Sequence, residues 1–346
     1  MKKTLVMSLM ILSAAMVMTE DTETAFGTKE KLTMVQEKVR WDELLPHEFL
    51  EARDRLPVCY MAYGLAEPHG AYNALGLDWL KAYALIESAA KQHGGIVAPP
   101  FAWHIQEIPE FHDDGKGHGW LPSVGVKQSL CSSIPSDLFY RMVFYQIRAM
   151  DARGFHAAVL VTGHYGGLER VMRKICEYYL RRTGSPIRLY AIADWECIDT
   201  HLAYRGDHAG VCETSQLMAL RPGLTDLNHQ TGNEELGERY AAGVNFSEGP
   251  IPTEEIGKRI VESQIRNLCG TATRLLSEYR PKDGWIAPDL NETEKIWNDF
   301  EHMTRRYWTT TYSDYKQGKV VRFPEWEELE KLHQRVPNKP DAGDGK

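Results

Sequence analysis

Short apolar segments alternate with longer amphipathic segments through most of the chain, from residue 56 to residue 279. The apolar segments have strand length, and the amphipathic ones repeat their apolar residues with helical spacing. This alternation predicts an α/β fold with a mostly parallel central sheet covered by helices on both faces. The expected strands are 56–63, 96–98, 157–162 and 187–193, and the expected helices are 77–92, 136–153, 168–182, 213–220 and 254–279.

The length and net charge of the chain limit the number of domains and the kinds of partner that it can have. The 346 residues suffice for one large α/β domain or two small ones. The formal net charge is −8, and no cluster of lysine or arginine marks a helix or a tail. We therefore expect no nucleic-acid partner. A small-molecule substrate that is not strongly anionic fits this charge better.

The first residues have the pattern of an export signal. Lys2 and Lys3 precede an apolar run at 5–18, which is short for a membrane span but typical of a signal peptide. We expect residues 1–19 to be removed, which leaves a periplasmic protein without a stable membrane span. The alternative is an apolar N-terminal extension on a cytoplasmic enzyme. The polar residues 20–45 predict a loose lead-in to the domain.

Cysteine spacing argues against a zinc–thiolate site. The six cysteines are scattered singly, without a CxxC pair. Most lie in apolar stretches, where a free cysteine behaves as a small hydrophobic residue. One or two disulfides could form after export, but the spacing assigns none.

Two segments fall outside the alternating pattern. Residues 101–128 are irregular, and long loops inside compact domains are often functional. The histidines of this loop could bind another metal, contact substrate or face solvent. Residues 281–346 predict a C-terminal extension wrapped on the domain, with a disordered tail after Pro337. The aromatic and histidine residues of the loop are Trp103, His104, His112, His118 and Trp120.

Acidic and histidine side chains follow the expected strands. Glu67 and His69 come directly after the first strand, two residues apart, so both can face one pocket in extended chain. Asp78 opens the next helix and can turn back toward them. His164 follows the third strand, and Glu213 lies where a loop enters a helix. Because sites gather at the carboxyl ends of parallel strands, we expect these side chains to meet.

This set of side chains suits a pair of metal ions. Mixed carboxylate and imidazole ligands fit zinc or manganese. If Asp78 bridges, each of two ions obtains three protein ligands. Two ions roughly 3.5 Å apart can deprotonate a water and polarise a carbonyl together. Each residue, taken singly, could instead have an ordinary structural role. Asp78 or Glu213 could stabilise a helix N-terminus, and a lone histidine could be a surface or core residue.

Three motifs give the chain a family resemblance. They are Glu67-Pro-His69-Gly70 followed by Asp78, Gly-His-Tyr-Gly-Gly from Gly163, and His-Ala-Gly-Val-Cys-Glu-Thr-Ser from His208. In this order they resemble the creatininase (creatinine amidohydrolase) family. The resemblance implies a three-layer α/β/α domain, here residues 46–280, usually assembled as a homo-oligomer and often as a hexamer. It also implies hydrolysis of carbon–nitrogen bonds in cyclic or linear amides with Zn, Mn or Fe.

The resemblance implies a role for each site residue. Creatininase has a ligand glutamate where this chain has Gly166, but other members with Gly-His-Gly-Gly at this place use the glutamate of the Glu-Thr-Ser motif, so the resemblance implies Glu213 in that role. His208 takes the place of a proton shuttle, and Asp207 that of a carboxylate that supports it. The other implied ligands of two divalent ions (zinc and/or manganese, with iron possible) are Glu67, His69, Asp78 and His164.

Aromatic residues are candidates for substrate contact. Trp195 and Tyr204 match the places of side chains that close over substrate in creatininase, although Trp195 could equally be a core aromatic. The further candidates are Tyr165, Trp103 and His104.

The expected reaction is hydrolysis by a metal-bound hydroxide that attacks the carbonyl of a small amide, lactam or related cyclic compound. His208 would protonate the leaving group. The family's FPGT motif is missing, and the segment 103–120 is a departure, so creatinine is not the expected substrate. One alternative is a metal-dependent hydrolase of an oxidised (keto) sugar or cyclitol that cleaves a non-amide bond. Another is a non-catalytic metal- or ligand-binding protein of the envelope.

Overall fold

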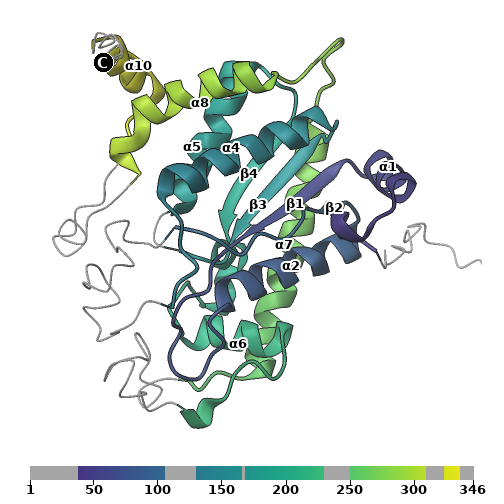
Figure 1. Ribbon diagram of the computed structural model, residues 1–346. Helices are drawn as coiled ribbons and strands as arrows, with labels where there is room; N and C mark the ends of the chain where they lie inside the picture. Colours follow the sequence, from purple (N-terminus) through teal and green to yellow (C-terminus); the bar gives the residue numbers. More distant parts are fainter. Residues whose placement is uncertain (1–37, 106–129, 166–167, 230–249, 309–322, 336–346) are drawn as a thin grey trace, which may run out of the picture. The chain divides into compact units, whose positions relative to one another are not determined.

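The computed structural model describes residues 38–105, 130–165, 168–229, 250–308 and 323–335 (Figure 1). The chain divides into two units, residues 1–33 and 34–346, and every described residue belongs to the second. The expected signal peptide, most of the 101–128 loop and the tail after Pro337 lie outside the described residues and stay predictions. So do the candidate loop residues His112, His118 and Trp120.

Four strands form a parallel sheet in the order β2-β1-β3-β4. The pairing aligns Tyr63 with Thr162 and Thr162 with Ala193, so β1, β3 and β4 end at one edge of the sheet. The α/β fold with a parallel sheet, expected from the sequence, is confirmed. The strands are β1 (Val58–Tyr63), β2 (Ile96–Val97), β3 (Ala157–Thr162) and β4 (Arg188–Ala193).

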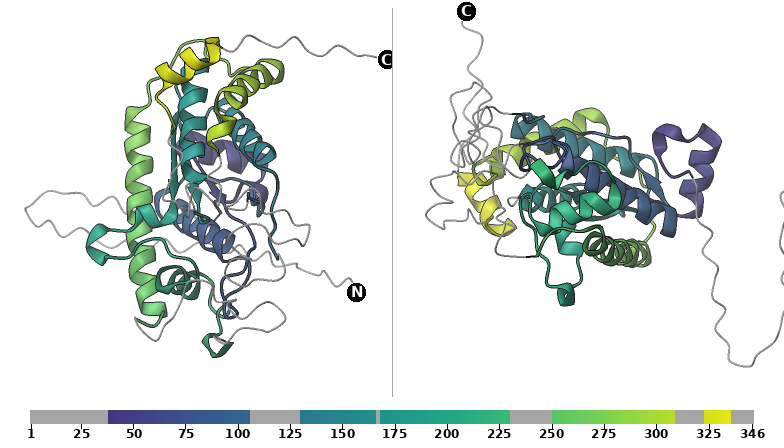
Figure 2. Two further views of the ribbon diagram at one scale, coloured as in Figure 1. Left: turned by 90° about the vertical axis from the view of Figure 1, so that its left-hand side faces the viewer. Right: turned by 90° about the horizontal axis from the view of Figure 1, so that it is seen from below.

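Helices cover both faces of this sheet, which gives the three layers that were expected (Figure 1). One face carries α4 (Ser136–Ala152), α5 (Leu168–Thr183) and α8 (Leu290–Thr304). The other carries α2 (Leu77–His93) and α7 (Glu254–Glu278), the long light-green helix of Figure 2. α6 (Val211–Leu220) packs against α2 and α7. The shorter elements are η1 (Trp41–Glu43), α1 (Pro46–Arg55), η2 (Asp194–Cys197), η3 (Thr200–Leu202), η4 (Leu227–His229), η5 (Arg305–Tyr307) and α10 (Trp326–Arg335).

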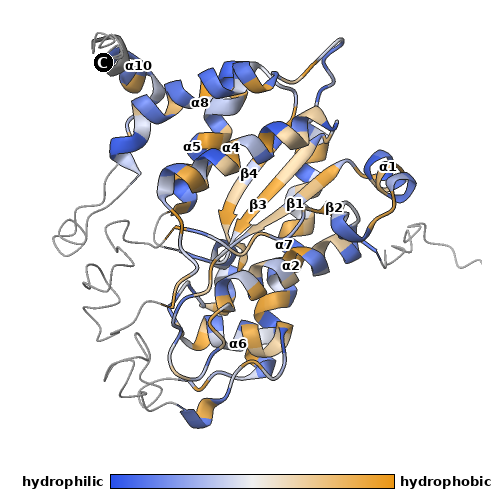
Figure 3. Cartoon of the chain, in the orientation of Figure 1, coloured by the Kyte–Doolittle hydropathy of each residue, from blue (hydrophilic) through white to orange (hydrophobic). Residues whose placement is uncertain are grey.

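Side chains of the central strand β3 are buried in both directions. Ala158 and Leu160 pack into the core beneath α4 and α5, whereas Val159 and Val161 pack into the core beneath α2 and α7. This period of two, with both faces apolar, is typical of a parallel strand that lies between two helical layers. Figure 3 shows the strands as the most hydrophobic part of the chain, with polar residues on the outer faces of the helices.

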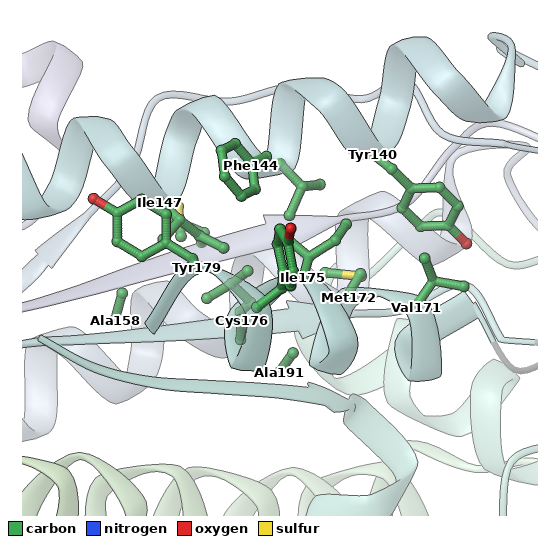
Figure 4. Packing of buried hydrophobic residues seen from close by; sticks show 14 of the residues in the cluster. Tyr140, Phe144, Ile147, Ala158, Val171, Met172, Ile175, Cys176, Tyr179 and Ala191 are labelled. Carbon is green, nitrogen blue, oxygen red and sulfur yellow. The ribbon is translucent and has the colours of Figure 1, made fainter. Parts of the chain in front are cut away.

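The layer of α4 and α5 is held by large apolar side chains at helical spacing (Figure 4). Tyr140, Phe144 and Ile147 of α4 share one core with Ile175 and Tyr179 of α5, and all five are fully buried. Burying one such side chain contributes about 2 kcal/mol. This packing fixes α5 and therefore β3, which lies beneath it.

The described part of the C-terminal segment shares this core. The ring of Trp297 in α8 lies 5.8 Å from that of Phe144, and the ring of Trp326 in α10 lies 5.3 Å from that of Tyr178 in α5, both measured between ring centroids. The segment thus completes the outer surface of the α4–α5 layer. Among the described residues, no helix has the length and apolar character needed to cross a bilayer.

α2 begins where β1 and β3 end, and two glycines permit this approach. A Cβ at Gly64 would lie 2.6 Å from the backbone nitrogen of Trp79, and one at Gly163 would lie 2.2 Å from the carbonyl oxygen of Asp78. Real Cβ atoms do not come so close to backbone, so only glycine fits at these two positions. The first turn of α2, with Asp78, is therefore seated on the carboxyl ends of the strands.

Candidate metal centre

Five acidic and histidine side chains meet at this edge of the sheet. Two come from the segment after β1, one from the first turn of α2, one from the end of β3 and one from the first turn of α6. All five are buried, with at most 4% of each exposed. Carboxylates are rarely buried unless they pair with a cation or a hydrogen-bond donor. The five residues are Glu67, His69, Asp78, His164 and Glu213.

Asp78 lies between the two histidines. Its Oδ2 is 2.9 Å from Nδ1 of His164, and its Oδ1 is 3.1 Å from Nε2 of His69. It therefore belongs to two groups of three side chains, each with its potential ligand atoms within 4.8 Å of one another. We call them position A (Glu67, Asp78 and His164) and position B (His69, Asp78 and Glu213).

The orientation of His69 fits a metal ligand. Its Nδ1 donates a hydrogen bond to the backbone carbonyl of Glu67 at 3.0 Å, which directs Nε2 into the cluster. Nε2 is buried and forms no hydrogen bond, although oxygens of Asp78, Glu213 and Glu67 lie 3.1, 3.6 and 3.8 Å away. A histidine fixed through one nitrogen and surrounded by carboxylates at the other is the usual arrangement at a metal. The residues present therefore fit a divalent ion.

The electrostatics of the cluster call for positive charge. Burial alone would raise the pKa of Asp78, but His69 and His164 hold it well below its ordinary value. Burial alone would lower the pKa of His69, but Asp78, Glu213 and Glu67 raise it to about 9. Protons on the histidines thus offset the carboxylates, as a divalent ion would do more strongly.

Glu213 is held by the entry to α6. Asp207 accepts backbone N–H groups of Cys212 and Glu213 on its two carboxylate oxygens, at 2.8 and 3.0 Å. Ala209, with a φ of 56°, donates its N–H to Oε2 of Glu213 at 2.8 Å. The sequence led us to expect Asp207 to support His208. In the structure both of its oxygens bind the N-terminus of α6, so Asp207 positions Glu213.

His208 lies over the cluster. Its ring stacks on that of His69 with centroids 4.4 Å apart and planes at 24°. Nε2 donates to the carbonyl of Pro68 at 2.9 Å, and Nδ1 lies 3.8 Å from Oε1 of Glu67. Ring nitrogens bind metals in the ring plane, so two nearly parallel stacked rings do not converge on one ion. His208 also groups with Glu67 and His69 as a possible ligand set, but the stacking favours a proton carrier.

A buried lysine and aspartate, which sequence reasoning missed, lie beside position B. Lys81 Nζ donates to Oε1 of Glu213 and to the hydroxyl of Tyr165, both at 2.6 Å. Tyr165 donates in turn to Oδ1 of Asp194 at 2.5 Å. Burial raises the pKa of Asp194 to about 6, and Lys81 opposes that rise. A sequence signal existed, since Lys81 follows Asp78 by three residues on the apolar face of a helix.

The residues predicted to contact substrate do not share one environment in the structure. Tyr165 uses its hydroxyl in the lysine network, while Trp195 and Tyr204 pack on a small apolar cluster of Ile198, Cys212 and Ile260. Trp103 is 49% exposed. His104 is fully buried, with its ring 3.8 Å from that of Phe139 and 5.2 Å from that of His164, measured between centroids. The structure thus brings His104 beside the metal centre.

Comparisons with known sequences identify similar proteins. The sequence model of creatininase (creatinine amidohydrolase) matches residues 42–269. A creatinine amidohydrolase from Pseudomonas putida is 22% identical over 190 residues, which are 49% of this chain and 67% of that protein.

Solved structures share the fold. The crystal structure of a creatininase superposes with a TM-score of 0.51 and 20% identity, over 71% of this chain and all of that one. A putative creatinine amidohydrolase from Bacteroides fragilis gives 0.53 and 15% identity, over 72% and 99% of the two chains. Similar structures include a manganese form of creatininase and a zinc–zinc form of a creatininase variant.

Proposed function

Because the chain belongs to the creatininase family, we propose that it is a metal-dependent hydrolase that cleaves a carbon–nitrogen bond in a small amide, lactam or related cyclic compound. The observation that carries the proposal is the placement of Asp78 between His69 and His164. One carboxylate shared by two buried ligand sets can hold a pair of divalent ions side by side.

The charge of the cluster supports two ions. Glu67, Asp78 and Glu213 contribute three negative charges in a buried space, and the opposite charges of Lys81 and Asp194 beside them offset each other. One divalent ion would leave a net negative charge there, whereas two would leave room for one further anion. Position A would hold one ion and position B the other. Two such ions would polarise a substrate carbonyl and lower the pKa of a water molecule.

His208 would move the proton. Its Nε2 is engaged by the carbonyl of Pro68, so Nδ1 is the nitrogen without a proton when the ring is neutral. Nδ1 can accept a proton from water and return it to the amine nitrogen as the carbon–nitrogen bond breaks. The stack on His69 and the bond to Pro68 hold the ring in place for both transfers.

The test combines metal content with a hydrolysis screen. The purified protein is loaded with zinc or manganese and screened against small amides and lactams, with keto sugars and cyclitols as a second panel. We expect the Glu67→Gln and His164→Ala variants to lose bound ions and activity together, and Glu51→Gln, at an exposed residue of α1, to keep both. Activity in a metal-free variant would reject the proposal. Turnover only of the second panel would reject amide hydrolysis.

A further inference from the structure

Lys81 is an internal cation that shares its partners with position B. Its side chain is fully buried, and Nζ lies 2.6 Å from Oε1 of Glu213. The same nitrogen is 3.9 Å from Oδ1 of Asp78, the oxygen that faces His69. Position A takes the other oxygen of Asp78, which lies 2.9 Å from His164. The ammonium group therefore lies on the side of the cluster where position B is.

The surroundings hold Lys81 in this place. Nζ lies 4.3 Å from the ring centroid of Tyr165 and 3.6 Å from Oδ2 of Asp194. A Cβ at residue 163 would come within 3.1 Å of Lys81 Cε, so Gly163 leaves the space that the lysine stem fills. An ammonium fixed by packing and by carboxylates cannot withdraw from an incoming ion by a simple change of rotamer.

Building on the proposed function, we propose that Lys81 makes the two ion positions unequal, so that position A fills first and position B binds its ion more weakly. An ion at position B would share Glu213 with the ammonium group. It could use Oε2, which faces His69 at 3.6 Å, while Oε1 stays with Lys81. Repulsion between a divalent ion and a positive charge held on the same carboxylate is strong at such separations. Position A does not share this partner.

Stepwise metal binding tests this directly. The ion-depleted protein is titrated with Mn²⁺ alone and with Zn²⁺ alone by calorimetry or against a coloured chelator. We expect two steps in the unmodified protein, with the second at least about tenfold weaker than the first. In Lys81→Met the second step should tighten by at least about tenfold, and in Lys81→Arg the gap should persist. Lys91→Met is the matched control, because Lys91 lies on the exposed side of the same helix.

The results of the titration distinguish a failure of the role of Lys81 from a failure of the proposed metal-dependent function. Two equal steps in the unmodified protein, or a Lys81→Met variant whose second step is unchanged or weaker, overturn the role of Lys81 and leave the metal centre intact. Absence of any specific ion binding in the unmodified protein overturns the proposed function itself.

A second measurement does not depend on how the variants fold. Crystals of the unmodified protein with one equivalent of Mn²⁺ are examined by anomalous scattering. We expect the peak between Glu67, Asp78 and His164. A peak between His69, Asp78 and Glu213 would show that the ammonium group does not weaken that position.

Discussion

Oδ2 of Asp78 lies 2.9 Å from Nδ1 of His164, although the two residues are 86 positions apart in the chain. The first turn of α2 carries the aspartate, and the end of β3 delivers the histidine. Their contact depends on a helix that starts against the ends of two strands. The consequences of this contact can be measured.

Asp78 is the shared member of both ligand sets, so its replacement should remove both ions. We expect Asp78→Asn to reduce bound metal to less than about a tenth of the normal content, since an amide is a weaker ligand for zinc and manganese than a carboxylate. Elemental analysis after dialysis gives the content. Asp54→Asn, at an exposed side chain of α1, should bind normally. Retention of one full equivalent by Asp78→Asn would contradict a shared ligand.

His208 should affect turnover without affecting metal content. We expect His208→Gln to lower kcat by about 10²–10⁴ while both ions stay bound, because general acid–base groups contribute on that scale. Burial lowers the pKa of His208, so its neutral form persists below the ordinary value of 6.5. The acidic limb of the kcat/KM profile should therefore lie below pH 6.5 in the unmodified enzyme and vanish in the variant. Loss of metal from His208→Gln would make it a ligand instead.

The ion-depleted protein should lose stability as the pH rises through the neutral range. Carboxylates outweigh burial and raise the pKa of His69 to about 9 from 6.5. A raised pKa of this kind stabilises the fold fully below pH 6.5, and the contribution disappears as the pH approaches 9. The loss for His69 alone is on the order of 3 kcal/mol. Urea unfolding of chelator-treated protein at pH 6 and pH 9 measures it. The metal-loaded protein should show a smaller change, because the ions replace those protons.

Gly163 should be required for the centre to form. A Cβ there would meet the carbonyl oxygen of Asp78 at 2.2 Å, so Gly163→Ala must displace the first turn of α2. We expect a loss of about 1–3 kcal/mol in stability and a clear loss of metal affinity. The matched control is Gly270→Ala, in α7, where an added Cβ meets nothing within 4 Å and helix propensity should stabilise the fold slightly. Unchanged metal affinity in Gly163→Ala would show that α2 can shift without harm to the site.

Much of the fold could be predicted from periodicity. The strand Ala157–Thr162 and the start of α2 at Leu77 were predicted at the observed residues. The spatial order β2-β1-β3-β4 could not be, because it depends on which helices cross which face of the sheet. The five candidate ligands follow strand ends and helix starts, and this placement is visible along the chain.

The partners of the charged residues next to the candidate ligands were harder to predict. Lys81 looks like an ordinary helical lysine until Asp194, 113 positions further on, is brought beside it. The family resemblance implied that Asp207 supports His208, whereas both of its oxygens accept backbone N–H groups of α6. Such pairings depend on tertiary packing, which local patterns do not record.

The single helical turn from Asp78 to Lys81 has a consequence for how such an enzyme can diversify. Asp78 belongs to both positions, and Lys81, three residues later, would adjust the charge at position B. Substitution at residue 81 would then change how tightly a descendant of this protein holds its second ion, while all five side chains stay the same. Two homologues with identical ligand sets can then differ in metal requirement, and the cause would lie in the interior of α2.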